Sequence, residues 1–301
     1  MKIAILSSKP KGIGPQRLKQ AARDAGHKVR IINYTKCYCN VERNNPMVFY
    51  KGKALDDLDA IIPRVAIDSQ GYGSAIIRQF EMMGVYSTTG SLAFLRARDK
   101  LRSLQLLARH NIDIPKTIFS RETKDVDSLI DAVGGSPIII KLVRGSLGAG
   151  VILGETRKAS KSIIQALYNQ EIDILVQEFI SESRGTDIRA FVIDGKVVAA
   201  MRRTAVGDEF RSNISLGAAA ELIDLSKKQT NIAIRAAQAM NLQIAGVDIL
   251  QSSRGPLVVE VNAFPGFKGI EAASGLDIAG MVISHVEQNT MKKRRRDKIG
   301  A

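Results

Sequence analysis

The stretch IAGVDILQSSRGPLVVEVNAFPG, residues 244–266, predicts a β-hairpin that carries polar side chains inside apolar strands. Asp248 lies in the first apolar run, and Glu260 and Asn262 lie in the second. Residues two apart on a strand share a face, so Glu260 and Asn262 point to the same side. A register symmetric about Arg254 places Asp248 directly opposite Glu260. The hairpin therefore predicts two carboxylates side by side on one face of a sheet.

This pair of carboxylates needs a compensating cation. Burying one unpaired carboxylate costs several kcal/mol, and two adjacent carboxylates repel each other. The candidate ligands are all oxygen atoms, with no His or Cys nearby in the sequence, so Mg²⁺ or Mn²⁺ is favoured over zinc. Mg²⁺ held by one or two carboxylates usually shares its ligand sphere with nucleotide phosphates. The alternative is a half-exposed hairpin whose polar side simply faces solvent.

The composition is that of a globular protein with an unevenly distributed positive charge. The 301 residues include 44 Lys and Arg against 30 Asp and Glu, which gives a net charge of +14. No apolar run approaches the roughly 18 residues that span a bilayer. Two Cys and three His exclude a disulfide scaffold and a Cys/His zinc module. We therefore expect a cytoplasmic protein with no membrane partner.

The positive charge is concentrated at the two ends of the chain. The excess is +9 over residues 1–100 and +5 over residues 292–301, whereas residues 101–291 are neutral. Residues 291–301 are expected to form a disordered basic tail, which either aids solubility or binds an anionic partner.

The first hundred residues predict an α/β domain, residues 1–95. Short apolar runs at Lys2–Ser7, Lys28–Ile32 and Asp59–Arg64 alternate with helical spacing, which is typical of a βαβ-type sheet. Pro63 is expected to end the third strand. Because ligands bind beyond the carboxyl ends of parallel strands, Arg64 is expected to face a substrate.

The rest of the chain predicts an α+β body. Ser91–Asn111 has the leucine spacing of one long helix that begins at a Ser cap. Residues 96–178 are expected to form a central subdomain and residues 179–290 a C-terminal one. In the latter, Asp194-Gly195 is a two-residue turn signal between the strands Ile188–Ile193 and Lys196–Met201.

Two lysines and a glycine loop suggest phosphate binding. Lys141 lies at the end of the apolar run SPIIIKL, where a lysine is costly unless it meets an anion. The segment 144–150, RGSLGAG, follows and leads into another apolar strand; such a loop can fold over phosphates or serve as a plain hairpin turn. It is not a P-loop, because no Gly-Lys-Ser/Thr follows. Lys100, in RARDKLRS, is expected either to bind phosphate together with Lys141 or to extend into solvent from an exposed helix face.

Taken in chain order, these pieces resemble the ATP-grasp superfamily over essentially the whole chain. The stretches RARDKLRSLQLLAR, SRGTDIRAFVIDGKVVAAMRR, FRSN and GVDILQSSRGPLVVEVNAFPG resemble the RimK-type glutamate ligases. The resemblance implies a fold of α/β and α+β parts: an N-terminal Rossmann-like pre-ATP-grasp domain, followed by an ATP-grasp fold with a nucleotide site between two α+β subdomains.

The resemblance also implies roles for the matched residues. The nucleotide-binding set would be Lys100, Lys141, Glu178, Phe179, Asp187, Arg211, Ser212 and Asn213. The ligands of two Mg²⁺ or Mn²⁺ ions would be Asp248, Glu260 and Asn262. Arg203 is the candidate for stabilising the tetrahedral oxyanion, the alternative being a surface arginine that ends a strand. The chain departs from the family at Arg144, where a Glu often stands, and at Gly217-Ala218, where Gly-Gly is usual.

The implied activity is that of an acid–amino-acid ligase. It would use ATP to add L-glutamate, once or several times, to the carboxyl terminus of small-subunit ribosomal protein six or to another acidic peptide. The resemblance to the family also implies a homo-oligomer, which we expect to be a tetramer. The first alternative is the same chemistry on a small-molecule acceptor, as in glutathione or amino-acid biosynthesis. The second is a non-enzymatic RNA- or ribosome-binding protein. Only 5% aromatic residues and a neutral central region argue against direct nucleic-acid binding.

Overall fold

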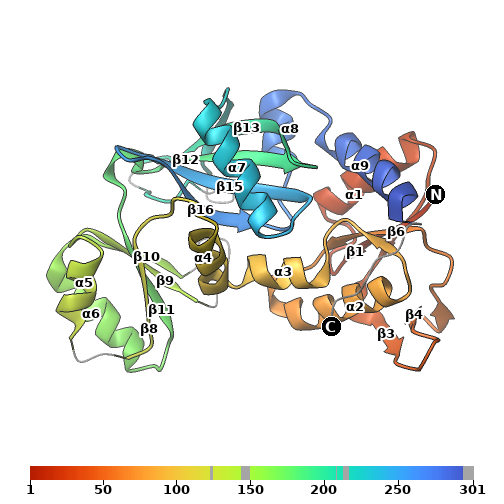
Figure 1. Ribbon diagram of the computed structural model, residues 1–301, viewed down its shortest axis with the longest axis horizontal. Helices are drawn as coiled ribbons and strands as arrows, with labels where there is room; N and C mark the ends of the chain where they lie inside the picture. The colour runs from red at the N-terminus through yellow and green to blue at the C-terminus, as the bar shows by residue number, and fades with distance from the viewer. Residues whose placement is uncertain (123–124, 144–149, 208, 213–216, 294–301) are drawn as a thin grey trace.

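The computed structural model describes residues 1–122, 125–143, 150–207, 209–212 and 217–293, and within these ranges the chain forms four sheets (Figure 1). The glycine-loop residues 144–149 and the tail residues 294–301 lie outside the described residues. Helix α9 (Ile278–Lys293) continues past residue 290, so the expected start of the tail falls inside a helix. Among the helices of the described ranges, none is both long and apolar enough to cross a membrane.

The N-terminal part contains the predicted parallel sheet, in the order β2-β1-β6-β7. Its strands and connecting helices are β1 (Lys2–Ser7), α1 (Ile13–Asp24), β2 (Lys28–Ile32), β6 (Ala60–Arg64), α2 (Gln70–Met82) and β7 (Tyr86–Ser87). Pro63 lies inside β6 rather than ending it. β7 pairs with Ala60 and Ile61 of β6 and ends before it reaches Pro63. On that side Pro63 therefore lies at the edge of the sheet, where a strand can lack a backbone N–H without losing a hydrogen bond to its neighbour.

A small antiparallel sheet between β2 and β6 was not predicted from the sequence. It consists of β3 (Cys37–Asn40), β4 (Met47–Tyr50) and β5 (Lys53–Ala54). Cys37 and Val48 are buried, and the hydroxyl of Tyr72 in α2 donates to the carbonyl of Cys37. The sheet therefore packs on α2, and its buried residues share one core with residues of the parallel sheet.

The central part is an antiparallel sheet in the order β10-β9-β11-β8. Its elements are β8 (Thr117–Ser120), α5 (Val126–Ala132), β9 (Ile138–Leu142), β10 (Val151–Gly154), α6 (Arg157–Tyr168) and β11 (Ile174–Glu178). The two helices bury Ile130 and Ile164 against Ile138, Ile140 and Val176. Figure 1 shows this part at the lower left, away from the N-terminal sheet.

The C-terminal part is a five-stranded antiparallel sheet in the order β14-β13-β12-β15-β16. Its elements are β12 (Thr186–Ile193), β13 (Lys196–Thr204), β14 (Ala219–Leu222), α7 (Lys227–Ala239), β15 (Ile244–Ser252) and β16 (Gly255–Asn262). Helix α7 covers one face and buries Ile232 and Ala236 against Ala190, Val247 and Val258. Helix α8 (Lys268–Ser274) packs on β13 and β14. On the opposite face, Phe191 and Met201 pack on Ile270 of α8, and the polar residues of the hairpin lie on the remaining part of that face.

Helix α9 returns from the C-terminal part to the N-terminal sheet (Figure 1). Ile278, Val282 and Ile283 share one core with Leu18 of α1 and Ile5 of β1. At the far end of the helix, the His27 ring contacts the Glu287 carboxylate at 2.8 Å. The cover of the N-terminal sheet thus comes in part from residues outside the range 1–95.

Both predicted hairpins are confirmed. Asp194 and Gly195 have φ of +48° and +72°, as the favoured type I′ turn requires. In the second hairpin Asp248 pairs with Glu260, as predicted. The turn itself is centred between Ser253 and Arg254 rather than on Arg254, because Ser252 pairs with Gly255. A bulge next to Asp248 inserts one extra residue in β16 and so restores the predicted pair.

The prediction of one long helix over Ser91–Asn111 is wrong. The chain forms α3 (Ser91–Arg98) and α4 (Lys100–Arg109), separated by Asp99 with an extended ψ of 105°. Gly90 is the N-cap of α3, while Ser91 donates from both its N–H and its hydroxyl to the Glu81 carboxylate. The Asp99 carboxylate caps α4 by accepting the N–H of Arg102 at 2.9 Å. The leucine spacing hid this break because it continues through both helices.

We expect Asp99→Ala to lower the free energy of unfolding by about 1 kcal/mol, the usual cost of losing an N-cap. The lost bond is the one from Arg102 N–H to the Asp99 carboxylate. Urea unfolding followed by circular dichroism measures the change, with Asp99→Ser as the control that keeps a capping oxygen. Equal loss in both variants would show that the carboxylate acts by some means other than capping.

Candidate active site

Six polar side chains share the face of the C-terminal sheet that α7 does not cover. The strand register places them together, since Arg189 of β12 pairs with Asp248 of β15, and Asp248 pairs with Glu260 of β16. Asp187 and Asn262 lie two residues from Arg189 and Glu260 on the same strands, and Arg203 of β13 pairs with Asp187. The six residues are Asp187, Arg189, Arg203, Asp248, Glu260 and Asn262.

Asp248 is held by two arginines. Arg189 donates to both of its carboxylate oxygens, from Nε at 2.6 Å and from Nη2 at 2.5 Å. Arg203 approaches the same carboxylate at 3.1 Å and also donates to Asp187, at 2.6 Å from Nε. Asp248 and Arg203 are 6% and 3% exposed. The alternatives of a solvent-facing Asp248 and of a surface Arg203 are therefore wrong.

The arginines set the charge states of the two buried aspartates. Burial alone would raise the pKa of Asp248, but the charges of Arg189 and Arg203 outweigh burial and hold that pKa below its usual range. Burial and the nearby charge of Asp248 raise the pKa of Asp187 in spite of Arg203. As pH falls, Asp187 is thus the first of the two to take up a proton.

Arg189 is the residue that sequence reasoning missed. Arg189 lies two residues from Asp187 in the sequence, and no role was predicted for it. In the structure, the cations that touch Asp248 are Arg189 and Arg203. The pairing of Arg189 with Asp248 depends on the register between β12 and β15, two strands that are not joined by a hairpin, so no local pattern in the sequence indicates it.

Two lysines from other elements lie close enough to Glu260 for its charge to act on them. Lys100, the first residue of α4, donates from Nζ to the carbonyl of Leu142 at 2.8 Å, and Lys141 precedes Leu142 in β9. Burial, with a contribution from the charge of Lys100, lowers the pKa of Lys141 to about 8, although Glu260 and Asp248 act in the opposite direction. Burial also lowers the pKa of Lys100, which Glu260 opposes. The two predicted phosphate ligands therefore lie near each other and near the predicted metal ligands.

The remaining predicted nucleotide-binding residues come from two segments of the sequence, Glu178–Phe179 and residues 211–213. Glu178, the last residue of β11, accepts the N–H of Lys116 at 2.7 Å and pairs with Arg254, with half-buried Phe179 next in the chain. Ser212 is buried and hydrogen-bonds the carboxylate of Asp187. Arg211 pairs instead with Glu209 at 2.7 Å. Asn213 lies outside the described residues.

The donor set suits a hard divalent cation. Asp248, Glu260 and Asn262 supply carboxylate and amide oxygens, the ligands that Mg²⁺ prefers. When the Asn262 amide is oriented to satisfy its neighbours, its nitrogen donates to Glu260 at 3.1 Å and its oxygen accepts from Arg189 at 3.2 Å. Glu260 is exposed. Of the carboxylates on this face, Asp248 and Glu260 are the paired ones, and no group of three or more acidic, His or Cys side chains that could hold a metal ion occurs in the described part of the chain. Phosphate oxygens would therefore have to complete the ligand sphere.

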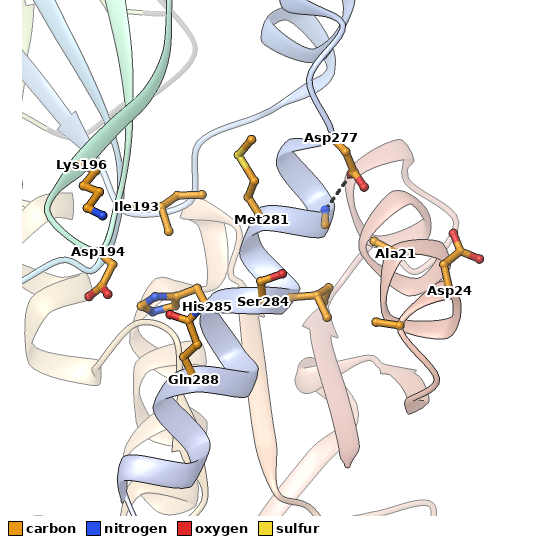
Figure 2. Close-up of a pocket in the computed structure, with 13 residues that line it drawn as sticks. Ala21, Asp24, Ile193, Asp194, Lys196, Asp277, Met281, Ser284, His285 and Gln288 are labelled. Carbon is orange, nitrogen blue, oxygen red and sulfur yellow. Dashed lines mark hydrogen bonds between the residues drawn. The ribbon is translucent and has the colours of Figure 1, made fainter.

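A surface pocket of about 580 Å³ lies elsewhere, between α1, α9 and the Asp194-Gly195 turn. Figure 2 shows Asp194 and His285 on one side of it and Asp24 on the other. Asp277 lies at its rim and accepts the N–H of Gly280 at 2.7 Å. None of the predicted site residues lines this pocket, which is therefore separate from the candidate active site.

Comparison with known proteins agrees with this arrangement. Residues 1–94 match the RimK PreATP-grasp domain and residues 97–286 match the RimK-like ATP-grasp domain. The chain is 48% identical over 299 residues to a probable alpha-L-glutamate ligase of Picosynechococcus sp., with 99% of both chains covered. It is 50% identical over 294 residues to a protein of the same name from Thioalkalivibrio sulfidiphilus, with 98% of both covered.

Solved structures show the same fold at low sequence identity. The ATP-grasp ligase PsnB, complexed with a phosphomimetic variant of its minimal precursor, Mg and ADP, superimposes with a TM-score of 0.75 at 22% identity and covers 96% of this chain and 98% of its own. The RimK domain protein ATP-grasp from Sphaerobacter thermophilus gives 0.71 at 19% identity, with 95% and 99% covered. These findings confirm the predicted ATP-grasp fold with an N-terminal pre-ATP-grasp domain. The chain belongs to the RimK-like ATP-grasp family and is an ATP-dependent ligase.

Proposed function

We propose that this ligase is an α-L-glutamate ligase. In the first step a carboxylate oxygen of the acceptor attacks the γ-phosphate of ATP, which releases ADP and leaves an acyl phosphate. In the second step the amine of L-glutamate attacks the acyl carbon and loses a proton, and inorganic phosphate leaves as the amide forms. The names of the relatives that match nearly the full chain support the choice of glutamate.

The observation that carries the proposal is the meeting of Lys100 and Lys141 with the Asp248–Glu260 pair. Two cations beside two carboxylates match the needs of a triphosphate that arrives with divalent metal ions. We assign the phosphates to the two lysines, and adenine and ribose to the segment Glu178–Phe179. Asp187 and the segment 211–213 would complete the nucleotide site.

Asp248, Glu260 and Asn262 would hold Mg²⁺ or Mn²⁺, two ions by our expectation. When bound, the metal neutralises charge on the phosphates during transfer. Arg189 holds the oxygens of Asp248 and Asn262 in place for this purpose. Arg203 remains our candidate for stabilising the oxyanion, and its bonds to Asp187 and Asp248 fix the position of its guanidinium.

We propose the carboxyl terminus of small-subunit ribosomal protein six as the acceptor. The test is incubation with ATP, Mg²⁺ and L-glutamate in the presence of total ribosomal proteins, followed by mass spectrometry of the intact proteins. The expected result is one protein that gains glutamyl residues only when ATP is present. Transfer of glutamate to small molecules but to no ribosomal protein would instead favour the small-molecule acceptor.

A further inference from the structure

Two arginines of the N-terminal part lie next to the candidate active site and take no part in the roles proposed above. Arg64 ends β6, and Arg98 ends α3. Arg64 donates from Nη1 to the carbonyl of Pro265 at 2.8 Å, just after the hairpin strand that carries Glu260. Arg98 donates from Nη2 to the carbonyl of Val65 at 3.0 Å. The pair is thus fixed where the N-terminal sheet meets the hairpin.

Neither arginine has a carboxylate partner within the residues that the structure describes. Their charges act on each other, since burial and then Arg98 lower the pKa of Arg64 to about 10. Burial likewise lowers the pKa of Arg98, with Glu260 the first of the groups that oppose the shift. In the described ranges the buried Nε of Arg98 has no acceptor. Two half-buried like charges oppose folding unless an anion joins them, so this arrangement favours a negatively charged ligand.

Aromatic rings hold both guanidinium groups. Arg98 lies over Phe94 and Phe264, with its guanidinium carbon 5.6 Å and 6.0 Å from the ring centres. Arg64 lies over Phe267 at 5.3 Å. Stacking orients a guanidinium while leaving N–H groups at its edge for a carboxylate. Gly14 borders this guanidinium, since a Cβ there would lie 3.7 Å from Arg64 Nη2, in ordinary van der Waals contact.

We propose that Arg64 and Arg98 bind the two carboxylates of the amino acid whose amine is joined to the acceptor. This inference rests on the proposed function. The incoming glutamate reacts through its amine, so both of its carboxylates stay charged throughout and need two separate cations. One arginine for each carboxylate would hold the amino acid beside the Glu260 end of the site. The pair would also select a dicarboxylic amino acid over one with a neutral side chain.

The test compares glutamate with glutamine as amine donors to a synthetic peptide of the ribosomal protein six carboxyl terminus. Arg64→Gln and Arg98→Gln are expected to raise the KM for glutamate by about 10- to 100-fold, the usual loss for one charge-assisted pair. One of the two should also lower the preference for glutamate over glutamine at least about 10-fold, which identifies the arginine that holds the side-chain carboxylate. Arg78→Gln, at an exposed position of α2, is the matched control and should change neither value.

Hydroxylamine separates the amino-acid site from the first step. It is small and neutral, and it attacks the acyl phosphate to give a hydroxamate without any amino acid. Both variants should form hydroxamate from the peptide and ATP at wild-type rates, which also shows that they are folded. Arg64→Lys and Arg98→Lys, which keep the charge, should recover part of the affinity for glutamate.

The outcomes distinguish this inference from the proposed function. If wild-type protein transfers no glutamate to any acceptor, both are lost. If it transfers glutamate and the glutamine variants keep their KM and preference, this inference alone is wrong. If the variants instead raise the KM for the peptide in the hydroxamate assay, the arginines bind the acceptor, and the assignment to the incoming amino acid is overturned.

Discussion

Asp248→Asn is expected to lower the free energy of unfolding by about 3–5 kcal/mol and to abolish ADP release. Asp248 is 6% exposed and accepts from Arg189 and Arg203. Among the described residues, losing this charge leaves Arg203 paired with Asp187 and Arg189 without an acidic partner. Breaking a buried pair costs that much because the remaining charge stays in place. Urea unfolding without nucleotide measures the stability, and a coupled assay measures ADP.

Glu260→Gln is the matched control, because Glu260 lies opposite Asp248 but is exposed. We expect it to lose activity while its stability changes by less than about 1 kcal/mol. If Asp248→Asn were as stable as Glu260→Gln, the arginines would not depend on Asp248, and the structural part of its role would be refuted.

The pH dependence of the Asp248 effect has a definite sign. Because the folded protein holds the pKa of Asp248 below its usual range, this carboxylate contributes stability above the unfolded pKa of about 3.9 and loses that contribution as pH falls further. The gap in stability between wild type and Asp248→Asn should therefore narrow below about pH 4. Asp187, whose pKa is raised, acts in the opposite direction.

Lys141→Met is expected to abolish ADP release and to raise the stability by about 1–3 kcal/mol at pH 7. Burial lowers the pKa of Lys141 from 10.5 to about 8, so the charged lysine destabilises the folded protein without nucleotide. As pH rises from about 8 toward 10.4, the folded state releases its proton before the unfolded state does. The free energy of unfolding of the wild type therefore rises relative to that of Lys141→Met, and the difference between the two values should shrink.

Lys158→Met serves as the control for Lys141→Met, since Lys158 is exposed on α6. It should change neither activity nor stability by a measurable amount. Thermal unfolding of both variants at pH 7 and pH 9.5 tests the claim. A loss of stability in Lys141→Met would mean that its attraction to Glu260 and Asp248 outweighs the cost of burying it.

The hairpin was predictable because its information is local. Alternating apolar residues and one turn fix which residues of two neighbouring strands face each other, and the Asp248–Glu260 pair followed from that alone. The prediction succeeded even though the turn lies half a residue away from the assumed centre, since the bulge compensates. Local patterns also located β1, β2 and the Asp194-Gly195 turn.

What the sequence did not reveal depends on contacts between distant segments. The role of Arg189 arises only once β12 lies beside β15, an order that neither strand encodes by itself. The break at Asp99 was missed because a single capping bond decides it, while the leucines on both sides continue one pattern. The small β3–β5 sheet was missed because its strands are two to four residues long and have little apolar alternation.

The return of α9 to the N-terminal sheet has a consequence for the order in which the protein can be made. Ile5 and Leu18 share their core with Ile278 and Val282, which leave the ribosome more than 250 residues later. Until then the apolar residues of α1 and β1 that face α9 stay exposed, so the core of the N-terminal part is completed only after α9 has been made. A nascent chain arrested before α9 therefore exposes apolar residues of α1 and β1 that α9 covers in the folded protein.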